Sequence, residues 1–184
     1  MKRALVIGDF HIPTRASGLD PRIRAKISEG YDVVLCTGDL VSPEVLDMLR
    51  DLAPEVKVVR GNMDYLPLPK YEELVLEGLR IVLTHGDEVH PRGDIEQLTD
   101  IALRKNADIL IHGHTHVLSV DLVERGGRRV LLVNPGSATG VWSGGGGSLI
   151  PSFAELYIEG RRAQVHAYEL KGSELQRRLY EFTL

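Results

Sequence analysis

The segment Ala4-Leu5-Val6-Ile7-Gly8-Asp9-Phe10-His11 places an apolar run directly before a carboxylate and an imidazole. A short apolar run that stops at a glycine predicts a buried β-strand. Carboxylates and imidazoles are metal-ligating groups, so Asp9 and His11 predict that this strand ends at a polar site. The rest of the chain repeats the arrangement.

Five further apolar runs end in the same way, at residue types that bind metal or phosphate. Residues 33–36 precede Thr37-Gly38-Asp39, residues 56–59 precede Arg60-Gly61-Asn62-Met63-Asp64, residues 81–83 precede Thr84-His85-Gly86-Asp87, residues 109–111 precede His112-Gly113-His114-Thr115-His116, and residues 130–133 precede Asn134-Pro135-Gly136-Ser137. In open α/β sheets, ligands bind beyond the carboxyl ends of the strands. The six loops therefore predict one shared site.

The first half of the chain alternates strands and helices. We expect strands at residues 3–7, 32–36 and 56–59. We expect helices at residues 21–29 and 43–52, the second with Ser42 as its N-cap and Pro43 at its first position. Such alternation predicts a parallel sheet covered by helices.

The second half is richer in hairpins. Glycine-containing turns separate residues 74–76 from 79–84, residues 117–124 from 128–134, and residues 153–158 from 163–170. A predicted helix at residues 95–105 precedes a strand at 108–111, and residues 173–181 are predicted to form a terminal helix. The fold class is α/β, with two packed sheets, helices outside them and a single domain over residues 1–184.

The composition limits the partners. The 184-residue chain is 43% hydrophobic and 26% charged, with a formal net charge of −4. No apolar run approaches the roughly 20 residues that span a bilayer, so we expect no membrane partner. The net charge argues against nucleic acid, whose binding needs many Lys and Arg contacts. The first strand leaves no room for a cleavable signal and the single Cys36 cannot form an internal disulfide, so we expect a cytoplasmic location.

Seven oxygen and nitrogen donors stand in the strand-end loops. Asp9 and His11 are one residue apart, as are His114 and His116, and in an extended backbone each such pair points to one side and can chelate one site. Asp39 adds a carboxylate able to bridge two cations, and the last two donors are Asn62 and His85. The set is too large for one tetrahedral zinc and predicts two divalent transition metals, chosen from Mn, Ni, Fe, Co or Zn, with Mn preferred.

The charge of such a centre favours a phosphate substrate. Two divalent cations, the carboxylates of Asp9 and Asp39 and a bridging hydroxide leave a formal charge of about +1, which attracts a small phosphorylated substrate. A two-metal site also makes hydroxide available near neutral pH and clamps an in-line displacement at phosphorus. We expect dinuclear metal-dependent hydrolysis of phosphate esters, with phosphodiesters preferred.

The ordered set of motifs resembles the calcineurin-like metallophosphoesterase superfamily, and its small prokaryotic phosphodiesterase branch in particular. The matching motifs are Asp9-x-His11, Gly38-Asp39, Gly61-Asn62, His85-Gly86 and Gly113-His114-Thr115-His116. The resemblance implies a four-layer α/β/β/α sandwich of two mixed sheets with flanking helices.

The resemblance also implies roles for the donors. Asp9, His11 and His116 would hold the first metal, while Asn62, His85 and His114 would hold the second. Asp39 would bridge them. Asn62 and His85 would also bind the substrate phosphate, so the catalytic residues would be Asn62, His85 and Asp39.

Two residues depart from the family pattern. Met63 stands where many members carry a histidine that helps to protonate the leaving group, and Asp87 stands where relatives often have a second histidine. A general acid is typically worth about 10²–10⁴-fold in rate, so we expect poor alkoxide leaving groups to react slowly. The small prokaryotic branch commonly lacks this histidine as well.

Several alternatives stay open. One retromer subunit resembles this branch and uses the fold for protein contact, so a non-catalytic protein-binding scaffold is the first alternative, and a nuclease is the second. The sequence leaves a homo-oligomer open too. The glycine-rich segment at residues 140–148 is either a surface loop or a lid in which Trp142 stacks on substrate. Asn134 is either a hydrogen-bonding support of the site or a loop anchor. Residues 13–19, 65–71, 90–94 and 140–151 are expected to border the metals and set specificity.

Overall fold

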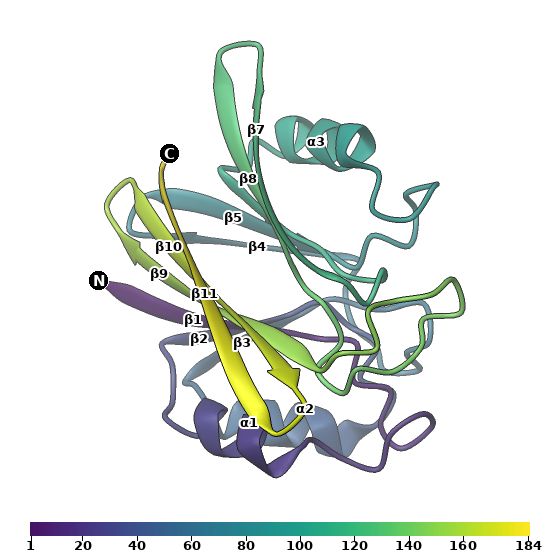
Figure 1. Cartoon of the computed structure of the whole chain (residues 1–184). Helices are drawn as coiled ribbons and strands as arrows, with labels where there is room; N and C mark the ends of the chain where they lie inside the picture. Colours follow the sequence, from purple (N-terminus) through teal and green to yellow (C-terminus); the bar gives the residue numbers. More distant parts are fainter.

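Two β-sheets lie face to face in the computed structural model, which describes all residues from Met1 to Leu184 (Figure 1). The first sheet has six strands in the order β11-β10-β9-β1-β2-β3. Its strands are β1 (Lys2–Ile7), β2 (Val33–Cys36), β3 (Glu55–Val58), β9 (Ser152–Glu159), β10 (Arg162–Lys171) and β11 (Glu174–Thr183). The pairs β1–β2 and β2–β3 are parallel, whereas β9, β10 and β11 add antiparallel strands beside β1.

The second sheet has five strands in the order β4-β5-β6-β8-β7. They are β4 (Tyr71–Leu76), β5 (Leu79–Thr84), β6 (Ile109–Ile111), β7 (Leu118–Arg125) and β8 (Arg128–Pro135). The three central strands, β5, β6 and β8, are parallel, and the hairpin partners β4 and β7 form the edges. Both sheets are therefore mixed.

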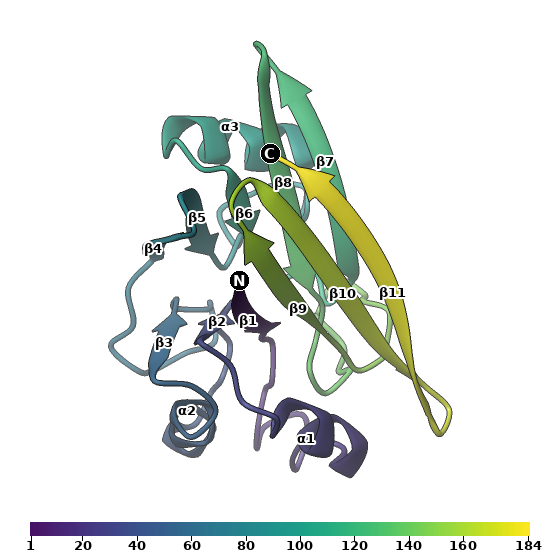
Figure 2. The ribbon, with the colours of Figure 1, turned by 90° about the vertical axis from the view of Figure 1, so that its left-hand side faces the viewer.

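Three helices cover the outer faces of the sheets. Helices α1 (Pro21–Ile27) and α2 (Pro43–Arg50) pack on the first sheet, and α3 (Ile95–Arg104) packs on the second (Figure 2). A core of 17 buried residues, almost all aliphatic, fills the space between the sheets. The expected four-layer α/β/β/α arrangement of two mixed sheets with flanking helices is confirmed. None of the helices combines the length and apolar character that crossing a membrane requires.

The helix starts follow the local sequence closely. Helix α2 begins at Pro43, as predicted, but the Ser42 side chain makes no capping hydrogen bond. Asp20 and Asp94 do cap their helices, because their side chains accept hydrogen bonds from the backbone N–H groups of Arg22 and Gln97. An N-cap acceptor of this kind satisfies one of the free N–H groups of the first turn.

The predicted terminal helix at residues 173–181 is wrong, because this segment is strand β11. It pairs along its whole length with β10, from Lys171↔Glu174 to Arg162↔Thr183, through a turn at Gly172 with φ of 63°. Its residues include good helix formers, but pairing with β10 packs Tyr180 and Phe182 against the core between the sheets. Tertiary pairing therefore overrides local propensity here.

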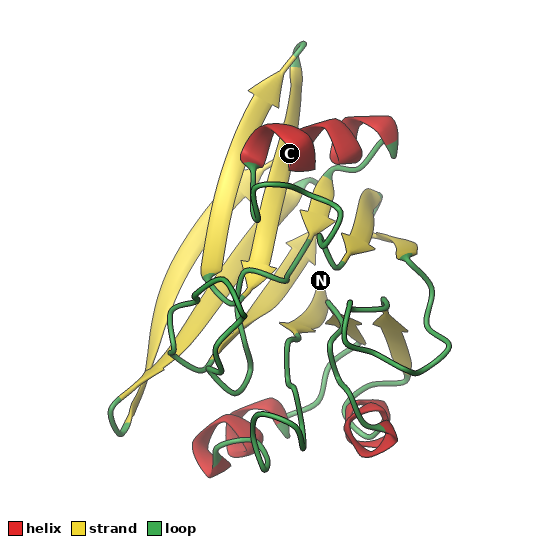
Figure 3. Ribbon diagram, turned by 90° about the vertical axis from the view of Figure 1, so that its right-hand side faces the viewer, coloured by secondary structure: helices red, strands yellow, loops and turns green.

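The parallel strands of both sheets end on one side of the molecule. Figure 3 looks onto this side, where loops gather between and below the sheet ends. The loops that follow β1, β2, β3, β5 and β6 carry all seven predicted donors. The fold thus delivers the predicted site residues to one place.

Candidate metal centre

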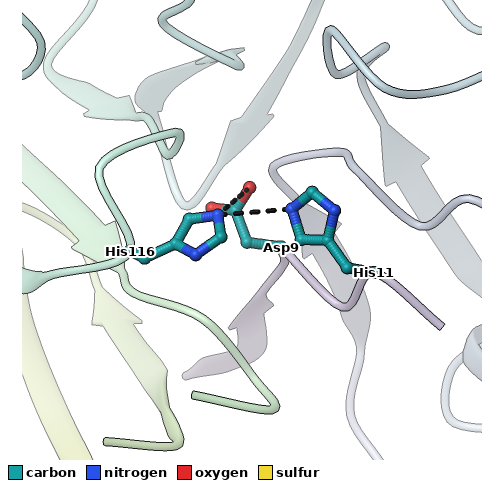
Figure 4. A group of neighbouring side chains, drawn as sticks. All are labelled: Asp9, His11 and His116. Atoms are coloured by element: carbon teal, nitrogen blue, oxygen red, sulfur yellow. Dashed lines mark hydrogen bonds and ion pairs between the residues drawn. The ribbon is translucent and has the colours of Figure 1, made fainter. Parts of the chain in front are cut away.

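The first group of donors consists of Asp9, His11 and His116. The side chains point towards one another from the loops after β1 and β6 (Figure 4). The Nε2 atoms of His11 and His116 lie 3.3 Å apart, and His116 Nε2 lies 3.5 Å from Asp9 Oδ1. All three residues are buried, and their ligand atoms lie within 4.8 Å of one another, as one shared cation requires.

The second group consists of Asp39, His85 and His114, again with ligand atoms within 4.8 Å of one another. His85 Nε2 lies 3.2 Å from Asp39 Oδ2 and 3.3 Å from His114 Nδ1. The amide oxygen of Asn62 lies 2.9 Å from the same His85 nitrogen. Asn62 is exposed, so its amide borders the group from the solvent side.

Asp39 connects the two groups. Its Oδ2 atom lies 3.4 Å from His11 Nε2 in the first group and 3.2 Å from His85 Nε2 in the second. Its Oδ1 atom accepts a hydrogen bond of 2.8 Å from the backbone N–H of Met63, which fixes the carboxylate plane. This is the position that a bridging ligand would need.

Carbonyl groups of the backbone orient two of the imidazoles. His85 Nδ1 lies 2.7 Å from the carbonyl oxygen of Thr37, and His116 Nδ1 lies 2.7 Å from that of Val141. An imidazole nitrogen facing a carbonyl oxygen must carry the proton, so the Nε2 atom of each ring faces its group. Such contacts behind a histidine are typical of metal ligands, whose orientation and basicity they set.

The electrostatics of the centre are those of a cation site. Burial alone would raise the pKa of Asp39, but contact with His85 holds it at about 2. Burial would lower the pKa of His85, yet the neighbouring carboxylates Asp39 and Asp9 raise it to about 9. Asp9 Oδ1 is buried without a hydrogen bond. Acceptors that converge in this way need a positive charge between them, so the residues present fit two divalent cations.

Five of the seven donors have a left-handed backbone. The φ angles are 50° at Asp9, 47° at His11, 54° at Asp39, 74° at His114 and 60° at His116. Non-glycine residues adopt this region rarely, at a cost of about 1–3 kcal/mol each, and such residues cluster at functional sites. The concentration of strained residues at one place is independent support for function.

The left-handed backbone also corrects the expected pairing rule. Asp9 and His11 do join the same group, but His114 and His116 join different groups. Neither pair lies in extended strand, so the alternation of side chains along a strand does not apply to them. The division of the histidines instead matches the one that the family resemblance implied, with His116 beside Asp9 and His114 beside His85.

Glycines let the loops approach this closely. A Cβ atom added at Gly61 would lie 2.1 Å from Asp39 Oδ1, and one added at Gly113 would lie 2.9 Å from the Thr37 side chain. Gly38 has a φ of 96°, and a Cβ atom there would lie 2.6 Å from the Gly61 backbone nitrogen. The glycines in the motifs are therefore steric requirements of the centre.

Three further residues support the site. Asp64 accepts hydrogen bonds from the backbone N–H groups of Asp39, Val41 and Gly61. Asn134 donates to Thr115 Oγ1 at 2.9 Å, and Ser137 Oγ donates to the carbonyl oxygen of Asp9 at 2.8 Å. Asn134 is thus a support of the histidine loop. All three residues lie in the motifs that follow the strands, which is the sequence feature that points to them. The sequence does not identify their hydrogen-bond partners.

Of the two departures from the family pattern, Asp87 is half-buried in the loop after β5, and Met63 borders the centre. The Met63 side chain is 41% exposed, and its backbone N–H rather than its side chain contacts Asp39. His112 is buried, with Nδ1 3.3 Å from the Asn134 amide nitrogen, and His90 is exposed. We find no contact that turns either histidine towards the two groups.

The sequence of this chain is similar to that of known proteins. A model described as the calcineurin-like phosphoesterase superfamily domain matches residues 1–159. A probable metallophosphoesterase of Methanocaldococcus jannaschii is 42% identical over 134 residues, which are 73% of this chain and 67% of that protein.

Two solved structures extend the comparison to the whole chain. Vps29 of Entamoeba histolytica in complex with Zn²⁺ is 36% identical, with a TM-score of 0.86 over 98% of this chain and 99% of that one. Vps29 of Chaetomium thermophilum in complex with a cyclic peptide is 27% identical, with a TM-score of 0.76 over 100% of this chain and 95% of that one. The family model and the relative with 42% identity together show that this chain belongs to the calcineurin-like phosphoesterase superfamily.

Proposed function

We propose that the protein is a two-metal phosphodiesterase. The family supports metal-dependent hydrolysis of phosphate esters in general. The observation that carries the proposal is Asp39 Oδ2, which lies within 3.4 Å of a histidine from each group, so that one carboxylate can serve two cations. When bound, such cations supply hydroxide near neutral pH and stabilise the charge of an in-line displacement at phosphorus.

Each donor would have a defined role in holding the two cations. Asp9, His11 and His116 would hold one cation, and His85, His114 and Asn62 the other, with Asp39 between them. We prefer Mn²⁺ because the set is made of oxygen and imidazole donors without thiolate, although Ni²⁺, Fe²⁺, Co²⁺ and Zn²⁺ suit it too. Asn62 is the exposed donor, and it lies against His85, so these two would also orient the substrate phosphate.

The site offers no side-chain acid at the position where many relatives carry one. Met63 cannot donate a proton, so the departing oxygen has to leave as a stable anion or take its proton from water. We therefore expect aryl phosphodiesters to react much faster than alkyl phosphodiesters. The proposal is a well-formed centre with a restricted range of leaving groups.

Hydrolysis of bis-p-nitrophenyl phosphate by protein reconstituted with Mn²⁺ or Ni²⁺ tests the proposal. We expect turnover between about pH 6 and 9, the range in which two-metal sites supply hydroxide. Asn62→Ala and His85→Ala should each lower the rate at least about 100-fold, the size of effect seen for groups that stabilise charge in a transition state. Arg177→Gln, on the exposed edge strand β11, is the control and should keep full activity. Absence of turnover with every metal would overturn the proposal.

The scaffold alternative has one observation in its favour, the peptide complex of Vps29 from Chaetomium thermophilum. A protein-binding role predicts a stoichiometric protein partner and a melting temperature that does not change when metal is removed. Affinity capture from the source cells, followed by melting curves with and without Mn²⁺, separates the two functions. A partner retained by metal-free protein of unchanged stability would favour the scaffold.

A further inference from the structure

Two arginines border the candidate centre from different parts of the chain. Arg15 lies in the loop between β1 and α1, and its backbone N–H donates to the carbonyl oxygen of His11 at 2.8 Å. Arg92 lies between β5 and α3. Gly93, the next residue, packs closely against the histidine loop, since a Cβ atom added there would lie 2.9 Å from the Thr115 side chain. Arg15 therefore lies beside the first group of donors, and Arg92 lies beside the loop that carries His114 and His116.

Both arginines contact the glycine loop, residues 140–148. The Arg15 guanidinium donates to the Trp142 carbonyl oxygen at 2.7 Å, and the Arg92 guanidinium donates to the Ser143 carbonyl oxygen at 2.8 Å. These carbonyls belong to consecutive residues, so the two guanidinium groups converge on one short stretch. The preceding residue, Val141, accepts the contact from His116. The glycine loop thus joins both arginines to the first group.

The two guanidinium groups have no counterion in the protein. Both side chains are exposed, and neither makes an ion pair with a carboxylate. Each uses one terminal nitrogen on the loop, which leaves its remaining N–H donors free. Two positive charges without a neighbouring carboxylate attract an anion to this part of the site. Guanidinium groups bind phosphate with particular strength, because their fork of donors matches its oxygens.

We propose that Arg15 and Arg92 bind a second phosphate of the substrate, which makes the substrate class a phosphodiester that carries an additional phosphoryl group. This inference rests on the proposed phosphodiesterase function. The arginines raise the formal charge of the metal-loaded site from about +1 to about +3, and a diester with one further phosphate carries about −3. The charges of site and substrate then balance.

Two chromogenic substrates that differ by one phosphate test the inference. We would compare thymidine p-nitrophenyl phosphate with the same compound phosphorylated on its free sugar hydroxyl, using Mn²⁺-loaded protein. We expect kcat/KM to be at least about tenfold higher for the phosphorylated compound, mostly through KM, because one charge-assisted phosphate contact is worth about that factor. Equal kcat/KM values would overturn the inference while leaving the phosphodiesterase function intact.

Variants separate phosphate binding from support of the loop. Arg15→Gln and Arg92→Gln should each reduce the preference about tenfold, because the kcat/KM of the phosphorylated compound should fall much more than that of the singly charged compound. Arg92→Lys, which keeps the charge, should retain part of the preference, and Arg177→Gln should retain all of it. An equal loss on both compounds would mean that the arginines only hold the loop, and would also overturn the inference.

Binding gives a readout that does not depend on turnover. We expect isothermal calorimetry on Mn²⁺-loaded protein to show tighter binding of thymidine bisphosphate than of thymidine monophosphate, by about tenfold or more, and Arg15→Gln to reduce the difference. If neither chromogenic compound were hydrolysed, the proposed function would fail, and calorimetry alone would decide the role of the arginines. Equal affinities for the two nucleotides would reject that role.

Discussion

Asp64 shows how a single residue organises the candidate centre without belonging to it. The carboxylate is buried and accepts three backbone hydrogen bonds of 2.8–2.9 Å, from Asp39, Val41 and Gly61. Asp39 and Val41 both have a left-handed backbone, with φ of 54° and 78°. Such a conformation is a true outlier for a β-branched residue, so it needs strong support. Asp64 provides that support through charge-assisted hydrogen bonds.

We predict that Asp64→Asn weakens both the fold and the centre. The new amide would place N–H donors against backbone N–H groups, with an expected loss of about 1–3 kcal/mol in the free energy of unfolding. Mn²⁺ affinity should fall roughly 10–100-fold, as for other residues that position metal ligands. Urea titration and metal titration measure the two effects. Asp47→Asn, on the exposed face of α2, is the control, and wild-type metal affinity in Asp64→Asn would contradict this role.

At the scale of elements, β11 completes the first sheet. It pairs only with β10, and its inward residues Tyr180 and Phe182 stack with ring planes 7° from parallel while packing against the core between the sheets. Leu175, at the other end of the strand, packs against the core beneath α1 and α2. One edge strand therefore touches both cores of the first sheet.

We predict that Phe182→Ala lowers the free energy of unfolding by about 1–3 kcal/mol, less than for a fully buried aromatic residue because Phe182 is half-buried. Leu179→Ala, on the same strand but 52% exposed, should change it by less than about 0.5 kcal/mol. Chemical denaturation checks both values. If Leu179→Ala cost as much as Phe182→Ala, the assigned faces of β11 would be wrong.

At the scale of the whole molecule, a buried carboxylate ties the first sheet to the chain around α1. Glu155 of β9 is fully buried and accepts hydrogen bonds of 2.7 Å from both Arg3 and Tyr31 and one of 3.2 Å from Tyr168. Arg3 lies on β1, Tyr31 precedes β2, and Tyr168 lies on β10. The network joins strands that are far apart in the sequence, and none of its residues is one of the seven donors.

We predict that Glu155→Gln destabilises the protein by about 1–3 kcal/mol, because a neutral amide replaces the buried carboxylate that Arg3, Tyr31 and Tyr168 contact, although Arg3 keeps its ion pair with Glu29. Metal content should stay at the wild-type value, since none of the seven donors contacts Glu155. Thermal unfolding and elemental analysis check the two statements. Glu174→Gln, an exposed change on β11, should leave both unchanged, and loss of metal from Glu155→Gln would show that the network and the centre are coupled.

Metal binding should stabilise the whole fold. The seven donors come from loops of both sheets, so only the folded chain assembles them, and a ligand that binds only the folded state adds about 2.7 kcal/mol at 100 times its Kd. For a chain of this size, the corresponding rise in Tm is roughly 5–10 °C. Calorimetry with Mn²⁺, and then with a chelator, measures the shift. His116→Ala should reduce it, and an unchanged wild-type Tm would argue against a metal centre.

Local sequence patterns are sufficient to predict most of the helices and strands and the seven candidate donors. Short apolar runs between glycines predict strands wherever they occur, and proline or aspartate at the start of α1, α2 and α3 marks those helices. The donors could be named because metal chemistry restricts them to a few residue types, and those types follow the strands directly. Local patterns carry this information, so no knowledge of distant contacts was needed.

The tertiary structure sets how these parts come together. It places Asp64 and Asn134 behind the donors, gives five donors a left-handed backbone, and pairs residues 174–183 with β10 instead of leaving them helical. Each of these outcomes depends on partners that are remote in the chain. Left-handed backbone and edge-strand pairing are stable only when such partners compensate their cost, and a local pattern contains no record of them.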